Sequence, residues 1–220
     1  MNEVGFETER VPLPPSFYRR DTVLVAQELL NCLLICSTPE GSLVGRITET
    51  EAYTEEDPAS HSFRGVRPRN RAMFEAGGRA YLYLCYGMYH CLNAVTMEAG
   101  KGCAVLLRAV EPLSGIPLMA QRRQIETATM PEPSSQEWVR YARKLCGGPG
   151  KLCQAYGLSL AQDNHDLTLG ENLWIAPPDP KCTRLGRCVA TPRIGISQGI
   201  ERLWRFHLED DPFLSRKSGR

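Results

Sequence analysis

The chain of 220 residues lacks any long apolar run. No stretch approaches the roughly 18 uninterrupted apolar residues of a membrane-spanning helix. The opening segment MNEVGFETERVPLPP mixes acids, Arg10 and prolines, and it lacks the apolar stretch of a signal peptide. We therefore expect no membrane association and an intracellular protein, cytoplasmic in a bacterium or nuclear in a eukaryote.

Metal-binding motifs are also lacking. The nine cysteines include no C-x-x-C pair, and the four histidines show no H-E-x-x-H or other paired ligand spacing. We expect reduced, mostly buried thiols, no metal and no cofactor.

The segment GGPGKL, residues 147–152, resembles a phosphate-binding loop, but Leu145 and Leu152 occupy the positions of the first glycine and of the Ser or Thr. A turn is the better prediction there.

Lysine is scarce, with only five among 26 basic residues, and the other 21 are arginine. Arginine binds phosphate or carboxylate through two parallel hydrogen bonds. The net charge of +1 gives no global argument for a nucleic-acid partner. Residues 64–79, RGVRPRNRAMFEAGGR, nevertheless contain five arginines and a single acid. This pattern predicts a basic patch that contacts a polyanion, with phosphate contacts from Arg64, Arg67, Arg69 and Arg71.

Hydrophobic patterning predicts both helices and strands. Asp21 is placed to cap a helix near 22–31, and residues 33–36 and 43–53 read as a hairpin. A loop-rich stretch over 54–80 precedes a second hairpin, a strand near 103–112 and further helical segments within 117–158. RIGISQG, residues 193–199, and WRFHL, residues 204–208, are predicted to close the sheet.

No repeat, composition break or linker divides the chain. We expect one α+β domain over residues 18–215, with a mixed, mainly antiparallel curved β-sheet flanked by helices. A flexible N-terminal arm, residues 1–17, and a flexible basic tail, residues 216–220, are expected on either side.

The segment AYLYLCYGMYHCLN, residues 80–93, contains half of the eight tyrosines. Tyr86 and Met88 fall where the chain must reverse, and large side chains at an exposed tip gain no core burial. Tyr81 and Tyr83 lie on one strand face, where core packing alone is the favoured explanation. An extruded nucleic-acid base would need aromatic walls around it and an apolar wedge in the gap that it leaves.

A second cluster lies in TETEAYTEEDPASHS, residues 48–62. Glu51 ends an apolar strand and is a candidate general base, with an aromatic ring at Tyr53 and a hydrogen-bonding group at His61. A solvated acidic loop is the alternative. Arg108 interrupts the apolar strand CAVLLRAVEP and needs an anionic partner, for which Glu49 and Glu51 both qualify. The sequence leaves open whether this pair is structural or catalytic.

With ETEAY, DPASHS, RNRAMF, AYLYLCYGMYHCLN, AVLLRAVEP, GGPGKLCQA and RIGIS in this order, the chain resembles the alkyladenine (3-methyladenine) DNA glycosylases. These base-excision repair enzymes are of the mammalian type and also occur in bacteria. The resemblance runs from about Tyr18 to Ser215. It implies an enzyme that acts on double-stranded DNA, flips out a damaged purine and hydrolyses its N-glycosidic bond with an activated water, which leaves an abasic site. A monomer is the default expectation.

The resemblance also implies roles for individual residues. Glu51 matches the general base, and Arg108 and the backbone carbonyl of Ile194 match groups that position the water. Tyr53, His61 and Tyr83 match the walls of the base pocket. Asn93 matches the residue that disfavours the exocyclic amino group of guanine. Tyr86 matches the intercalating residue, and Met88 lies beside it at the same tip. Tyr81 and Tyr89 are left to packing. The expected substrates are 3-methyladenine, 7-methylguanine, hypoxanthine and ethenoadenine.

No lysine lies between Met1 and Gly100, so no local amine is available to form a Schiff base beside Glu51. We therefore expect a monofunctional glycosylase that uses water. Two other classes stay open: a non-catalytic nucleic-acid-binding module with the same surface, and a glycoside or nucleoside hydrolase that pairs Glu51 with another carboxylate.

Overall fold

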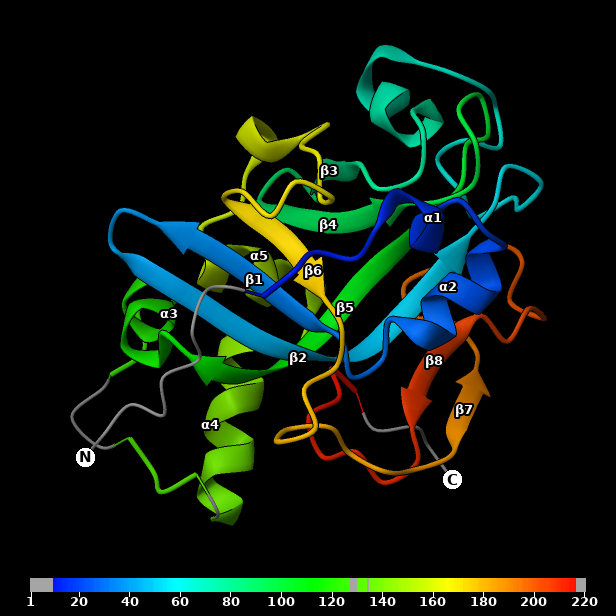
Figure 1. The fold of residues 1–220 in the computed structure, drawn as a ribbon. Coiled ribbons are helices and arrows are strands. Elements are labelled where there is room, and N and C mark those ends of the chain that lie inside the picture. The colour runs from blue at the N-terminus through cyan, green and yellow to red at the C-terminus, as the bar shows by residue number, and fades with distance from the viewer. Residues whose placement is uncertain (1–9, 127–129, 134, 217–220) are drawn as a thin grey trace.

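The structure, a computed structural model, describes residues 10–126, 130–133 and 135–216 (Figure 1). The chain first forms two short helices and the strands that lead into the central sheet, and three further helices precede the last three strands. The elements in chain order are α1 (Pro15–Tyr18), α2 (Thr22–Glu28), β1 (Leu33–Thr38), β2 (Gly41–Tyr53), the 3₁₀ helix η1 (Pro68–Phe74), β3 (Ala80–Cys85), β4 (Tyr89–Val95), β5 (Ala104–Ser114), α3 (Ile116–Arg122), α4 (Gln136–Cys146), α5 (Pro149–Tyr156), the 3₁₀ helix η2 (Leu160–Gln162), β6 (Leu173–Ala176), β7 (Cys188–Thr191) and β8 (Arg205–Leu208).

One eight-stranded sheet organises the fold. The strand order is β3-β4-β5-β2-β1-β6, and β8 pairs with both β2 and β7. All pairings between the described strands are antiparallel. The predicted α+β class with a mainly antiparallel curved sheet is confirmed.

β2 is the central strand, and it changes its partner along its length. Its first part pairs with β1, its residues 49–51 pair with β8, and β5 runs along its other edge. The register against β5 is irregular between Ile47 and Glu49 and again between Glu49 and Thr50. Glu49 and Glu51 therefore lie where the sheet bends away from β1 toward β8.

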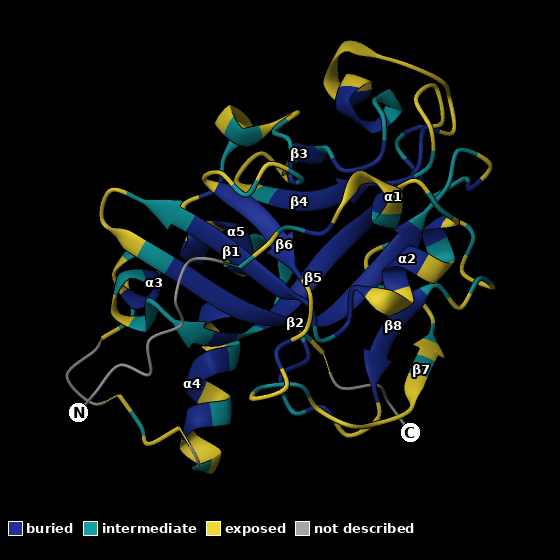
Figure 2. Ribbon diagram, viewed as in Figure 1, coloured by how far each residue is buried: buried dark blue, intermediate teal, exposed yellow. Residues whose placement is uncertain are grey.

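Helices cover the sheet and complete the core. The Oδ1 atom of Asp21 accepts the N–H of Leu24 at 2.9 Å, as predicted for a cap, and Ala26 accepts the hydroxyl of Thr50 from β2 at 2.7 Å. α2 ends earlier than predicted because the chain turns at Asn31, whose φ is 69°. α5 packs on β4 and β5. The central strands are buried, while β7 and many of the loops are exposed (Figure 2).

The prediction that residues 193–199 form a strand is wrong. This segment is a loop, because the N–H of Ile194 binds a side chain instead of a neighbouring strand, and Gly195 and Gly199 have φ values of 83° and 62°. The sheet is completed by β6, β7 and β8, of which only β8 was predicted. Residues 149–152 form the first turn of α5 instead of an isolated turn.

The N-terminal arm is packed where the structure describes it. The N–H of Leu13 donates to the carbonyl of Ile175 at 2.8 Å, and the indole of Trp174 donates to the carbonyl of Arg10 at 3.0 Å. Residues 10 and 13 of the predicted arm are therefore hydrogen-bonded to β6. Residues 1–9 and residues 217–220 of the predicted tail lie outside the described residues.

Two kinds of feature are absent from the described part of the chain. Within residues 10–126, 130–133 and 135–216, no helix is long and apolar enough to cross a membrane. The same residues contain no group of three or more His, Cys, Asp and Glu side chains that could hold a metal ion. All nine cysteines are free thiols, and six of them are buried.

Candidate active site

Two buried carboxylates on β2 share one arginine. The Nε atom of Arg108 donates to Glu49 at 2.9 Å, and its Nη1 atom donates to Glu51 at 3.2 Å. Both glutamates are completely buried, and Arg108 on β5 is nearly so. The sequence left open which acid pairs with this arginine, and the structure brings both to it.

Glu49 accepts hydrogen bonds from four donors, including the Ser215 hydroxyl at 2.9 Å. Its Oε1 atom also accepts from Arg205 at 2.6 Å, and the Ser215 N–H donates to its Oε2 atom at 2.6 Å. Burial opposes the charge of Glu49, but Arg108 and Arg205 outweigh it and lower the pKa of this carboxyl. Glu49 is therefore a structural anion, ionised at neutral pH.

The pKa of Glu51 is shifted in the opposite direction. Its Oε1 atom accepts the backbone N–H of Ile194 at 2.7 Å, and its Oε2 atom accepts the Tyr53 hydroxyl at 2.8 Å. Burial raises the pKa of this carboxyl, more than Arg108, the Ile194 N–H and the Tyr53 hydroxyl together lower it. A carboxylate offers about four acceptor positions, and the contacts with Arg108, Ile194 and Tyr53 use three of them; no described residue donates to a second position on Oε1.

An aromatic cavity of about 210 Å³ lies beside this carboxylate. Glu51 is not part of the lining, but Tyr53, to which it is bonded, is part of it. The lining combines aromatic rings, a thioether, a thiol, an amide and a glycine-containing wall: Tyr53, Ala59, Ser60, His61, Met73, Tyr81, Tyr83, Cys85, Tyr86, Asn93, Gly195 and Ile196. The cavity therefore brings together side chains from β2, β3, β4, η1 and the 193–199 loop.

His61, Tyr81 and Tyr83 form one corner of the cavity. The Nδ1 atom of His61 and the hydroxyl of Tyr81 share a hydrogen bond of 2.8 Å, and the His61 ring meets the Tyr83 ring edge to face at 4.5 Å. Burial lowers the pKa of His61, and nearby Arg69 lowers it further. The imidazole is therefore neutral at pH 7, and its orientation is fixed from two sides.

Asn93 lies on β4 directly opposite Tyr81 in the sheet. Its side-chain nitrogen donates to the carbonyl of Tyr81 at 3.0 Å, and the residue is buried. Burial also raises the pKa of the Tyr53, Tyr81 and Tyr83 hydroxyls, which stay protonated. The cavity is therefore lined by neutral groups held in fixed positions.

The tip of the β3–β4 hairpin projects from the molecule. Tyr86 is 82% exposed and Met88 is 66% exposed. Tyr86 has a φ of 51°, and Gly87, with a φ of 71°, completes the reversal. Tyr86 also lines the cavity, whereas Met88 does not. The structure thus places a large exposed ring at the cavity entrance, as the sequence predicted for the tip.

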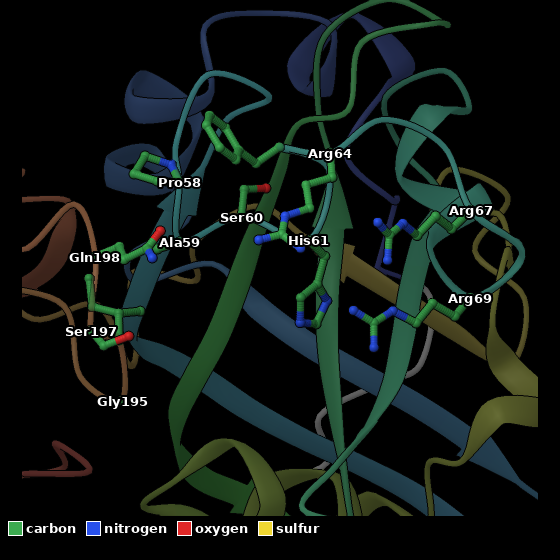
Figure 3. A pocket seen from close by; sticks show the side chains of 12 residues that line it. Pro58, Ala59, Ser60, His61, Arg64, Arg67, Arg69, Gly195, Ser197 and Gln198 are labelled. Atoms are coloured by element: carbon green, nitrogen blue, oxygen red, sulfur yellow. The ribbon is translucent and has the colours of Figure 1, made fainter.

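Figure 3 shows a second, larger cavity of about 380 Å³. It shares five lining residues with the first: Ala59, Ser60, His61, Gly195 and Ile196. Arg64, Arg67 and Arg69 line this cavity, and all three are exposed. Arg71 is exposed but is not part of the lining. Among the described residues, none of these four arginines has a carboxylate partner within ion-pair distance. Three of the four predicted arginines therefore line a cavity that shares a wall with the aromatic cavity.

Sequence reasoning missed several residues of the site. Tyr81 was left to packing, yet it both lines the cavity and holds His61; its position two residues before Tyr83 on the same strand face was the available signal. Tyr89 is 46% exposed and lies against Gly150 of α5. Met73 and Cys85 gave no signal in the sequence. For Ile194, the contact with Glu51 is made by the backbone N–H, while the resemblance implied a role for its carbonyl.

Comparison with known proteins agrees with this geometry. The family described as Methylpurine-DNA glycosylase (MPG) matches residues 16–212. A protein of Rubrobacter xylanophilus is 48% identical over 180 residues, which cover 81% of this chain and 84% of that protein. Proteins of Carboxydothermus hydrogenoformans and Methanoculleus marisnigri are 40% and 41% identical, each over 93% of this chain and 99% of their own length. All three carry the provisional name 3-methyladenine DNA glycosylase.

Proposed function

The chain belongs to the methylpurine-DNA glycosylase family and is a DNA-3-methyladenine glycosylase, and from this premise we propose how it recognises its base and breaks the bond. A damaged purine is flipped out of duplex DNA into the aromatic cavity. A water activated by Glu51 attacks the sugar carbon, the N-glycosidic bond breaks, and an abasic site remains. The substrate class is 3-methyladenine, 7-methylguanine, hypoxanthine or ethenoadenine.

The arrangement of Glu51 is the observation that carries this proposal. Its carboxylate is buried next to the cavity, its pKa is raised, and one acceptor position on Oε1 has no donor among the described residues. A raised pKa makes a carboxylate a stronger base. Arg108 and the Ile194 N–H fix its orientation, so that this position can hold one water.

The other buried carboxylate does not supply a second acid. Glu49 has a lowered pKa and is bonded to Arg108, Arg205 and Ser215. A hydrolase with paired carboxylates needs one that stays protonated to assist the leaving group. The arrangement therefore favours a reaction in which the damaged base leaves readily by itself, as an alkylated, positively charged purine does.

Recognition of the base rests on the cavity walls. Faces of Tyr53 and Tyr83 attract a cationic purine through their π-electrons. His61 is neutral at pH 7 because its pKa is lowered, so it does not repel such a base and can hydrogen-bond to the purine edge. Asn93 is held by the Tyr81 carbonyl, and in this fixed position it disfavours the exocyclic amino group of normal guanine.

DNA binding uses the surroundings of the cavity. The exposed ring of Tyr86, with Met88 beside it, enters the duplex and fills the gap left by the flipped base. Arg64, Arg67, Arg69 and Arg71 contact backbone phosphates. Lysine is not among the residues that line either cavity, and this supports a monofunctional enzyme that does not cleave the strand. We further propose that residues 18–215 form the catalytic domain and that it acts as a monomer.

The test is base release under single-turnover conditions. Methylated duplex DNA and duplexes with one hypoxanthine or one ethenoadenine are incubated with excess protein, and half of each sample is then treated with alkali. We expect free damaged base, and strand breaks only in the alkali-treated half. Tight binding without release of any base would contradict the proposal, and breaks without alkali would contradict its monofunctional part.

A further inference from the structure

Arg193 is a buried arginine that the catalytic scheme above does not use. Its side chain has no exposed surface, and it forms a two-contact ion pair with Asp57, whose side chain is equally buried. The Nη2 atom of Arg193 lies 3.0 Å from Oδ1 of Asp57. Removing one partner of such a pair leaves an uncompensated buried charge.

The guanidinium joins three segments of the site. Its Nη1 atom donates to the carbonyl of Ala52, at the end of β2, at 2.9 Å, and its Nη2 atom donates to the carbonyl of Gly199 at 3.3 Å. It also lies 4.6 Å from the centre of the Tyr53 ring and 5.4 Å from that of Trp204. Asp57 begins the stretch that leads to His61. One side chain thus ties the catalytic strand, the His61 loop and the 193–199 loop together.

The residues next to Arg193 make the contacts that matter for catalysis. Ile194 supplies the N–H that holds Oε1 of Glu51, and Gly195 and Ile196 form one wall of the aromatic cavity. We propose that Arg193 is a positioning residue for base excision: anchored by Asp57, it fixes the 193–199 loop so that Ile194 orients the Glu51 carboxylate. This inference rests on the proposed role of Glu51 and extends it.

A purely structural role is the alternative, and the chain contains a matched example of one. Arg46 is also completely buried and pairs with Glu111 and Asp211, at 2.7 Å and 2.8 Å. Neither it nor these partners touch Glu51 or line the aromatic cavity. If buried ion pairs here serve stability alone, substitutions at Arg46 and Arg193 should behave alike.

The pH dependence of excision distinguishes the two roles. Glu51 faces Arg108 on β5, Arg205 on β8, Glu49 and Tyr53 on its own strand, and the Ile194 N–H. Arg193→Lys keeps the positive charge but loses the planar fork that reaches Asp57, Ala52 and Gly199 together. The Ile194 N–H and the Tyr53 hydroxyl then hold the ionised carboxylate less well, and the pH at which excision reaches half its maximal rate should rise.

The experiment compares wild type, Arg193→Lys and Arg46→Lys on methylated duplex DNA. Single-turnover excision rates are measured as a function of pH. The affinity of each protein for a duplex carrying an abasic-site analogue and its melting temperature are measured as well. We expect Arg193→Lys to lower the maximal excision rate by about 10- to 100-fold, as small misplacements of catalytic groups do. It should also raise the pH at which the rate is half maximal and leave the affinity for the duplex unchanged. Arg46→Lys should lower only the melting temperature.

A second substitution displaces the Arg193–Asp57 ion pair, here called the clamp, without removing either side chain. It decides between the positioning role and the structural role if Arg193→Lys does not fold. A Cβ atom at Gly199 would lie 2.7 Å from Oδ1 of Asp57 and 3.1 Å from Nη2 of Arg193. Gly199→Ala must therefore displace the pair. Gly100→Ala is the control, because Gly100 has a comparable positive φ of 90° but open space around its Cβ position. We expect the slower rate and the raised midpoint for Gly199→Ala alone.

Equal midpoints for wild type and the clamp variants would overturn the inference, as would equal changes in Arg46→Lys. Its failure differs from that of the proposed function. If wild type releases no base, or if Glu51→Gln releases it normally, the role of Glu51 falls and the inference falls with it. If wild type is active and Glu51→Gln is not, while the clamp variants match their controls, the inference alone is overturned.

Discussion

Glu51→Gln is the most informative single substitution in this enzyme. It preserves the shape of the side chain but removes the charge that Glu51 needs for its proposed role as a base. The glutamine oxygen can still accept the Ile194 N–H, now found at 2.7 Å from Oε1, while its amide nitrogen then faces Arg108 and the Tyr53 hydroxyl. Tyr53 can reverse its hydroxyl to accept a hydrogen bond from this amide, whereas Arg108, which can only donate, loses this contact and keeps its bond to Glu49.

The expected loss follows from the role of a general base. Such a group contributes about 10²- to 10⁴-fold to the rate, and each factor of ten corresponds to about 1.4 kcal/mol of activation free energy. The single-turnover excision rate of Glu51→Gln should therefore fall by about 10²- to 10⁴-fold, or about 3 to 5.5 kcal/mol. Glu51 is absent from the cavity lining, so the affinity for a duplex with an abasic-site analogue should change little.

The assay measures release of 7-methylguanine from methylated duplex DNA with enzyme in excess, and a thermal melt confirms folding. Glu49→Gln is the matched control, because it alters the neighbouring buried carboxylate and leaves Glu51 in place. An excision rate for Glu51→Gln within a few-fold of wild type would refute the assignment of the base. A similar loss of rate in both variants, with both folded, would refute the distinction drawn between the two carboxylates.

Two further predictions concern other parts of the molecule. Tyr86→Ser should weaken binding to a lesion duplex and slow excision without changing the melting temperature, because the ring is 82% exposed; equilibrium binding and a thermal melt check this, and unchanged affinity would remove the wedge role. Glu49→Gln should destabilise the fold by about 3 to 5 kcal/mol, as breaking a buried ion pair does, and denaturant unfolding measures it. Because the folded-state pKa of Glu49 is lowered, its stabilising contribution is present above the unfolded pKa of about 4.3 and is lost as pH falls toward the folded value. The stability difference between wild type and Glu49→Gln should therefore shrink in acid, and a pH-independent difference would contradict this account.

Local patterns predicted the parts of the site that lie on regular elements. The β2 strand, the β3–β4 hairpin and the Asp21 cap follow from alternation, turn residues and capping chemistry. The same alternation placed Glu49 and Glu51 on one side of β2, where both meet Arg108. Residues on one strand are related by its geometry, so their relative directions can be read from sequence.

Contacts between distant segments could not be read in this way. The segment RIGISQG has the apolar alternation of a strand, but Asp57 and Glu51 capture its Arg193 side chain and its Ile194 N–H. These partners lie more than 130 residues earlier in the chain, and no local sequence pattern predicts the contacts. Likewise, Tyr81 looks like a core residue until His61 is seen at its hydroxyl.

The opposite pKa shifts of Glu49 and Glu51 also could not be predicted from the sequence. Both are strand glutamates two positions apart, and both touch Arg108. The extra partners of Glu49, Arg205 and Ser215, come from the end of the chain and lower its pKa, whereas burial raises that of Glu51. Chemistry at this site is thus set by the segments that return to β2 late in the chain.

The central claim is that an ionised, buried Glu51 activates the water, and the pH dependence of excision tests it most directly. Methylated DNA is the right substrate, because an alkylated base already carries positive charge and needs no protonation to leave. Burial raises the pKa of Glu51 above its usual value, so the single-turnover rate of wild type should rise with pH to a plateau, with a midpoint above about 4.3, the value of an ordinary glutamate. The residual rate of Glu51→Gln should show no such rise. A flat profile for wild type, or the same rise in both proteins, would contradict the account.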